Sequence, residues 1–166
     1  MKKTISSVVL LLLTISLFAQ KPISKGQTQL NAGIGFSGWG MPVYVGLDYG
    51  VHPDISMGGE LSYRSYSESL VGAKYSHSVI GIIGNGNYHF NRVMNIPSPW
   101  DFYAGLNLGF YNMSSPSNYG GSNSSGLGLG AQIGGRYYFS QKWGVNLEIG
   151  GGNSVSGGKL GITFKF

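Results

Sequence analysis

Apolar residues alternate with small or polar residues through most of the chain beyond residue 20. In residues 43–51, for example, Val, Leu and Tyr fill the odd positions, while Tyr, Gly and Asp fill the even ones. Successive side chains of a β-strand point to opposite faces, so this pattern predicts strands with one apolar face. No apolar stripe with helical spacing exceeds two turns after residue 20. We therefore expect this part of the chain to be all-β.

The alternation predicts eight strands. Val79 and Ile83 interrupt the fourth, which leaves the pattern of its first half open. The strands approach the ~10 residues that a tilted strand needs to cross a bilayer, and turn-forming residues separate them. The longest predicted loops cover residues 67–76 and 112–125. The expected strands are residues 29–36, 43–51, 55–64, 79–90, 102–111, 127–139, 143–149 and 159–166.

Residues 1–20 differ from the rest of the chain. Lys2 and Lys3 precede an apolar run from Val8 to Ala19, which is too short for a transmembrane helix but has the length of the apolar core of a signal peptide. We expect residues 1–20 to be a cleaved signal peptide, although no well-formed cleavage site follows them. A retained membrane anchor is the alternative. Residues 21–166 then form a single domain.

Composition excludes several classes of protein. The chain contains 29 Gly, no Cys, 11 Lys and Arg, and 6 Asp and Glu in 166 residues. The hydrophobic content of 42% is too high for a disordered chain, and the absence of Cys excludes thiolate metal centres and disulfide scaffolds. The cations are scattered singly beyond residue 20, so we expect no nucleic-acid partner.

Alternation alone fits either a soluble barrel with an apolar interior or a membrane barrel with an apolar exterior. The non-apolar face is mostly Gly, Asn, Gln, Ser and Tyr rather than the Lys, Glu and Asp expected of a water-exposed surface. Small neutral residues suit the crowded interior of a narrow barrel. This composition favours a membrane barrel over a secreted lipocalin-like or avidin-like barrel.

Aromatic residues of the apolar face gather near the strand ends, as they do in the interfacial girdles of membrane barrels. The segment between the two predicted girdles carries no charge on this face. If the chain starts in the periplasm, the upper girdle contains Phe36, Tyr63 and Phe110, and the lower girdle contains Tyr49, Tyr88, Phe90, Phe102, Tyr137, Phe139, Trp143, Phe164 and Phe166.

Together, the leader, the eight strands, the segment GGRYYFSQKWGVNLEIG and the ending KLGITFKF resemble the small OmpA/OmpX-type (porin-like) outer-membrane barrels. The resemblance covers about 140 residues. It implies an eight-stranded antiparallel up-and-down transmembrane barrel in the bacterial outer membrane, reached through the periplasm. It also implies that the terminal aromatic residues Phe164 and Phe166 form the signal read by the outer-membrane assembly machinery. We expect a monomer in contact with outer-membrane lipids.

The interior of such a barrel would contain Asp48, Glu60, Arg64, Arg136 and Glu148, with Lys159 and Lys165 nearer the rims. Unpaired buried charges cost several kcal/mol each, so we expect these groups to form ion pairs that fill the lumen. The alternative is a gated pore in which Glu60 or Glu148 exchanges partners with Arg136.

Three functions remain open. The first is a structural or surface-interaction role with a plugged lumen, in which residues 67–76 and 112–125 could contact an extracellular ligand. The second is a narrow channel for small solutes. The third is a lipid-modifying enzyme, for which His77 is placed better than His52 or His89 because it lies toward the outer side. We expect no catalytic activity, cofactor or metal, because the histidines are dispersed and the Gly-rich stretches do not lead into helices.

Overall fold

The computed structural model describes residues 22–38, 40–70, 73–116, 125–152 and 157–166. The expected signal peptide lies outside these residues. Within them, no helix is long and apolar enough to cross a membrane. The described chain folds into eight strands: β1 (Thr28–Phe36), β2 (Val43–His52), β3 (Ile55–Leu70), β4 (Ala73–His89), β5 (Trp100–Ser114), β6 (Gly126–Tyr138), β7 (Trp143–Gly152) and β8 (Gly157–Lys165).

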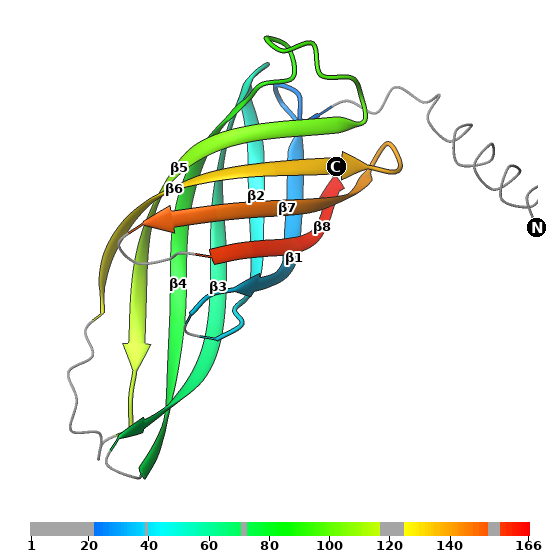
Figure 1. Cartoon of the computed structure of the whole chain (residues 1–166). Coiled ribbons are helices and arrows are strands. Elements are labelled where there is room, and N and C mark those ends of the chain that lie inside the picture. The colour runs from blue at the N-terminus through cyan, green and yellow to red at the C-terminus, as the bar shows by residue number, and fades with distance from the viewer. Residues whose placement is uncertain (1–21, 39, 71–72, 117–124, 153–156) are drawn as a thin grey trace, which may run out of the picture.

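The strands form one closed barrel in which each strand pairs antiparallel with the next and β8 returns to pair with β1 (Figure 1). The expected eight-stranded antiparallel up-and-down barrel is confirmed. We call the end that holds residues 22–27, 53–54, 90–99 and 139–142 the terminal end. The opposite end, which holds residues 37–38 and 40–42, the last residues of β3 and the first residues of β4, is the distal end.

Closure brings glycine against glycine at the junction of β1 and β8. Gly33 pairs with Gly161 in the antiparallel register. A Cβ added to Gly33 would lie 2.2 Å from the Leu160 carbonyl oxygen and 2.6 Å from Gly161 Cα. Only a residue without a side chain allows the two backbones to approach this closely, so the sequence permits closure at this point.

The alternation of the sequence becomes the inner and outer faces of the barrel. Along β2, even-numbered residues from Tyr44 to Gly50 are buried and odd-numbered residues are exposed. The outer face is apolar, with Leu106 71% and Ile133 62% exposed. Contact between such a continuous apolar surface and water is unfavourable, whereas contact with the acyl chains of lipids is favourable.

Three strand boundaries correct the sequence prediction. β3 continues to Leu70 and β4 begins at Ala73, so most of the loop expected at residues 67–76 is strand. We call these added residues of the two strands the β3–β4 extension. The loop expected at residues 112–125 is shorter too, because β5 continues to Ser114. In the β3–β4 extension the outward positions become Ser65, Ser67 and Ser69, so the apolar signal used to recognise strands is lost although pairing continues.

The irregularity in the fourth strand also has a structural cause. Val79 and Ile83 do not break the alternation, because both point into the barrel. There they pack with Tyr111 in a small buried apolar cluster, against which Tyr66 and Met113 also lie. An apolar interior patch near the distal end therefore produced the misleading pattern.

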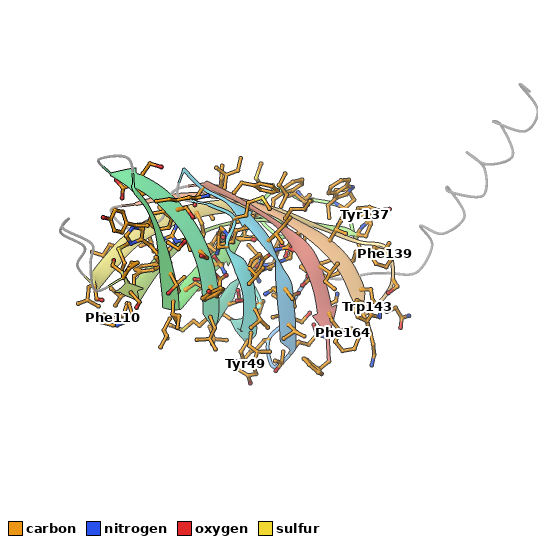
Figure 2. The ribbon with its side chains drawn as sticks, turned by 90° about the horizontal axis from the view of Figure 1, so that it is seen from below. Tyr49, Phe110, Tyr137, Phe139, Trp143 and Phe164 are labelled. Atoms are coloured by element: carbon orange, nitrogen blue, oxygen red, sulfur yellow. The ribbon has the colours of Figure 1, made fainter. Side chains whose placement is uncertain are left out.

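The labelled aromatic side chains separate toward the two ends of the barrel. In Figure 2, Phe110 lies away from the group of Tyr137, Phe139, Trp143 and Phe164. At the terminal end, ring pairs form between Trp143 and Phe164 at 4.6 Å, and between Phe164 and Phe166 at 5.2 Å. Tyr88 contacts Phe90 at 5.3 Å.

Trp100 joins the aromatic residues at the terminal end, although the sequence analysis did not select it. Its ring centroid lies 4.8 Å from that of Tyr137 and 5.8 Å from that of Phe102. Of the remaining predicted girdle residues, Phe36, Tyr49, Tyr63 and Phe139 are each 47–49% exposed on the outer face.

Candidate functional site in the barrel interior

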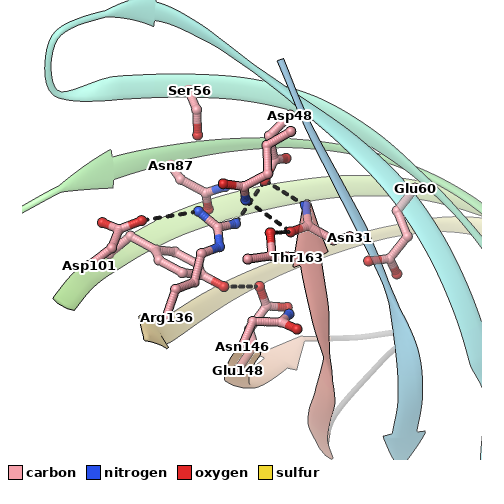
Figure 3. Close-up of polar contacts among 12 residues, drawn as sticks. Asn31, Asp48, Ser56, Glu60, Asn87, Asp101, Arg136, Asn146, Glu148 and Thr163 are labelled. Carbon is pink, nitrogen blue, oxygen red and sulfur yellow. Dashed lines mark hydrogen bonds and ion pairs between the residues drawn. The ribbon is translucent and has the colours of Figure 1, made fainter. Parts of the chain in front are cut away.

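The interior nearer the terminal end is organised around the Arg136 guanidinium on β6. Its Nη2 donates to Asp48 Oδ2 on β2 at 2.7 Å, and its Nη1 donates to Asp101 Oδ2 on β5 at 3.3 Å (Figure 3). All three side chains are at most 3% exposed. We call this group the Arg136 layer. Asp101 was missed by the sequence analysis, which began the fifth strand one residue later.

Amides and hydroxyls extend this layer around the wall. Asn31 Nδ2 donates to Asp48 at 2.9 Å, and Asn31 Oδ1 accepts from Thr163 at 2.6 Å and from Gln29 at 2.9 Å. Gln29 in turn accepts from the Tyr138 hydroxyl at 2.6 Å. The Arg136–Asp48 ion pair is thus joined to a chain of neutral hydrogen bonds, whereas Arg136 Nε is buried without a hydrogen-bond partner among the described residues.

A second layer is centred on Lys159 of β8. Its Nζ donates to both oxygens of Glu60 on β3 at 2.9 and 2.8 Å, and lies 3.2 Å from Glu148 Oε1 on β7. We call this group the Lys159 layer. Lys159, which we expected nearer a rim, lies near the distal start of β8 (Gly157–Lys165). Its long side chain reaches inward and pairs with Glu60 and Glu148. In the gated-pore alternative, these two glutamates were expected to exchange partners with Arg136.

Tyr103 connects the two layers. Its hydroxyl donates to Glu148 at 2.9 Å, while the Arg136 guanidinium carbon lies 4.3 Å from the centre of its ring. A cavity of about 20 Å³ lies between the layers and is bordered by Asp48, Glu60 and Arg136. On the distal side of the Lys159 layer, a cavity of about 40 Å³ is bordered by Phe36, Tyr111 and Lys159. These volumes are enough for only a few water molecules.

The other two predicted interior cations lie elsewhere. Arg64 is 7% exposed, and its Nη1 donates to the Ser37 hydroxyl at 3.3 Å toward the distal end. Lys165 is 4% exposed at the terminal end, with its Nζ 3.7 Å from the centre of the Tyr138 ring.

On the terminal side of the Arg136 layer, β3, β4 and β5 bring together the side chains of Ser56, His89 and Asp101. His89 Nδ1 lies 2.8 Å from Asp101 Oδ1, and His89 Nε2 lies 2.9 Å from Ser56 Oγ. An ionised carboxylate only accepts, so Nδ1 carries a proton, and in the tautomer with a single ring proton Nε2 accepts from the serine hydroxyl. This is the hydrogen-bond order of a nucleophilic triad.

The three side chains of this series are closed to solvent. Ser56 and Asp101 are 0% exposed and His89 is 3% exposed. Neither of the two cavities above is bordered by Ser56. Asp101 also accepts from Arg136, which ties the series to the Arg136 layer. The arrangement therefore extends the interior network toward the terminal end.

The other two histidines lie in different parts of the barrel. His77 points into the barrel and is 1% exposed, so it does not face acyl chains outside the wall as the enzyme hypothesis requires. Its Nδ1 lies 2.9 Å from Ser115 Oγ, and its ring stacks on Tyr66. His52 lies at the end of β2 beside Asp54. Among the described residues, no group of three His, Cys, Asp or Glu side chains could hold a metal ion.

Comparisons with known proteins extend the sequence-based resemblance to the fold. No known protein family matches the sequence, and no curated protein matches it. Among solved structures, OprG from Pseudomonas aeruginosa superposes with a TM-score of 0.67 at 10% identity, covering 86% of this chain and 97% of OprG. The N-terminal barrel domain of OprF from the same organism gives 0.52 at 18% identity, covering 86% and 98%.

Ail, the attachment invasion locus protein of Yersinia pestis, was solved in complex with the heparin analogue sucrose octasulfate. It matches with a TM-score of 0.55 at 14% identity, covering 86% of this chain and 99% of Ail. At these identities the likeness concerns the backbone. The chain has the fold of the small eight-stranded outer-membrane β-barrels.

Proposed function

We propose that this chain is an integral outer-membrane protein, exported by residues 1–20 and inserted as a barrel through its apolar outer face. The fold and the exposed Leu, Ile and Val side chains between the aromatic groups support this placement. Outward positions from Ile55 to Tyr63 and from Ile80 to Tyr88 carry no charge, as a lipid-facing surface requires.

The lumen of the proposed barrel is closed by side chains, which makes a structural or surface-interaction role the best supported one. The observation that carries this proposal is the pair of ion-pair layers, Arg136 with Asp48 and Lys159 with Glu60, each of which joins strands across the interior. An eight-stranded barrel is just wide enough for its interior to be filled in this way.

A narrow channel is the second candidate, favoured by the two cavities on either side of the Lys159 layer. Conduction would require Lys159 to leave both glutamates and Arg136 to leave Asp48. Each movement exposes buried carboxylates without a counterion, which costs several kcal/mol. We therefore rank the closed barrel first.

Two measurements test the proposal. Cell fractionation should recover the protein in the outer membrane, and the purified barrel should migrate differently on gels before and after heating. Recovery as a soluble protein without detergent would contradict the membrane assignment. In planar bilayers the purified protein should show no steady current. Stable open channels would contradict the closed lumen while leaving the membrane assignment intact.

The distal end is where an extracellular ligand would bind under this proposal. Its described surface includes the β3–β4 extension, whose inner side presents Tyr66, Glu68 and Tyr75. Residues 117–124, within the second predicted ligand loop, lie outside the described residues. No catalytic role is proposed for this end, because the ring of His77 is buried in the wall.

A further inference from the structure

The terminal end exposes cationic side chains but no acidic side chain among its described residues. Lys25 before β1, Arg92 between β4 and β5, and Lys142 between β6 and β7 are all exposed. Asp54 and Asp101, the acids at this end, are 4% and 0% exposed, and Asp54 pairs with Arg92. We call Lys25, Arg92 and Lys142 the cationic rim. At the distal end, by contrast, exposed Lys74 is balanced by exposed Glu68.

Lys142 lies over an aromatic surface at this rim. Its Nζ is 5.7 Å from the centre of the Phe164 ring, which also contacts Trp143 and Phe166. Aromatic rings of this kind gather where the bilayer meets water, at the depth of the lipid headgroups. In the proposed membrane, the ammonium group of Lys142 would therefore lie beside the lipid phosphates.

The β4–β5 connection adds an apolar contact beside these charges. Val93 is 64% and Met94 66% exposed, next to Arg92. The connection is held in shape by backbone hydrogen bonds from Met94 N to Phe90 O and from Ile96 N to Asn91 O, each 2.9 Å. It is also long for this end, since barrels of this class join their strands here by short turns. Exposed apolar residues beside cations are typical of segments that lie in a membrane interface.

We propose that the cationic rim binds anionic phospholipids of the adjacent leaflet, with Lys142 contacting the phosphate and Val93 and Met94 entering the boundary of the acyl chains. This rests on the proposed membrane function and adds a lipid class to it. Lys25 and Lys142 make no ion pair within the described residues, so both are available to a phosphate. An exposed lysine near an anionic surface strengthens binding by about fivefold, and salt weakens the effect.

The test uses the full protein, purified from membranes and reconstituted in nanodiscs that contain phosphatidylcholine with or without one quarter phosphatidylglycerol. Native mass spectrometry counts the bound lipids of each class. The variants are Lys142→Gln alone, Lys25→Gln with Lys142→Gln, and Val93→Ser with Met94→Ser. Lys74→Gln, an equal change of charge at the distal end, is the matched control.

We expect the wild type to retain phosphatidylglycerol in preference to phosphatidylcholine. Lys142→Gln should reduce that preference about fivefold and the double lysine variant further, while Lys74→Gln leaves it unchanged. The Val93 and Met94 variant should lower retention of both lipids. Excess soluble glycerophosphoglycerol should not displace the lipid, because it lacks acyl chains. Displacement would instead indicate a site for free phosphate esters and would overturn the lipid assignment.

Equal retention of both lipids by the wild type would overturn the inference, as would an equal loss of preference in Lys74→Gln. These results differ from a failure of the proposed function. A protein that inserts in either nanodisc without preferring one lipid refutes only the lipid site. A protein that enters neither refutes the membrane assignment itself.

Discussion

Arg136 and Asp48 pair across the full width of the barrel, with Nη2 and Oδ2 2.7 Å apart. Their strands, β6 and β2, are separated by three strands in either direction around the closed sheet. A contact between opposite walls constrains the sheet in a way that hydrogen bonds between neighbouring strands do not. The interior charges therefore bear on both the stability of the barrel and its permeability.

Replacing Arg136 by Ala should destabilise the barrel by about 3–5 kcal/mol, because it leaves Asp48 and Asp101 buried without their counterion. Urea unfolding followed by tryptophan fluorescence in detergent measures the loss. Lys74→Ala, which removes an exposed cation at the distal end, should change the free energy of unfolding by less than about 0.5 kcal/mol. Similar losses for the two variants would show that the buried ion pair contributes no more to the free energy of unfolding than an exposed cation does.

Permeability should depend on both layers. Lys159→Ala should join the two cavities, which share Lys159 and Glu148 in their walls, yet leave the protein non-conducting because the Arg136 layer stays in place. Adding Arg136→Ala should produce a current in planar bilayers. That current should favour cations, because four interior carboxylates lose their partners. A steady current in Lys159→Ala alone would show that Arg136 and Asp48 do not close the lumen.

The β1–β8 junction should not tolerate a side chain at Gly33. Gly33→Ala would place a methyl group against the Leu160 carbonyl, and we expect a loss of about 1–3 kcal/mol in stability. Gly86→Ala is the control, since an added Cβ there meets nothing within 4 Å. Thermal gel-shift assays on both variants provide the comparison, and equal midpoints would contradict the steric argument.

Deleting Phe166 should reduce insertion in cells more than folding in purified lipid vesicles. In the structure Phe166 contributes an edge contact to Phe164 and one backbone hydrogen bond to Thr28, which is a modest part of the barrel. A large defect confined to cells would support recognition of the terminal aromatic residues by the assembly machinery. Equal insertion of the deleted and intact chains in cells would contradict it.

Ser56 should not react with fluorophosphonate probes, although its hydrogen bond to His89 resembles that of a catalytic serine. Its 0% exposure leaves no route for the probe. Labelling of the folded wild type that disappears in Ser56→Ala would reveal a reactive nucleophile and would overturn the structural interpretation of this series.

The sequence predicted the barrel well because an apolar outer face opposite a polar inner face enforces a two-residue period, which appears in all eight strands. It predicted the interior less well because contacts across the lumen depend on strand stagger and side-chain reach. Lys159 therefore reaches Glu60 although it was expected near a rim. The Ser56, His89 and Asp101 series comes from three strands and has no local signature. Val79 and Ile83 show the converse, an interior apolar patch that imitates a broken strand.

The unequal strand lengths affect how a molecule could approach the barrel interior at the distal end. β3, β4 and β5 contain 15–17 residues and are neighbours, while β7, β8, β1 and β2 contain 9 or 10 and are also neighbours. Among the described residues, the barrel wall at the distal end is therefore higher on the side of β3, β4 and β5 than on the side of β7, β8, β1 and β2. In the proposed membrane, the described wall on the side of β7, β8, β1 and β2 would therefore offer the shorter path to the cavity beside Lys159, while the side of β3 and β4 would present outward serines such as Ser65 and Ser67.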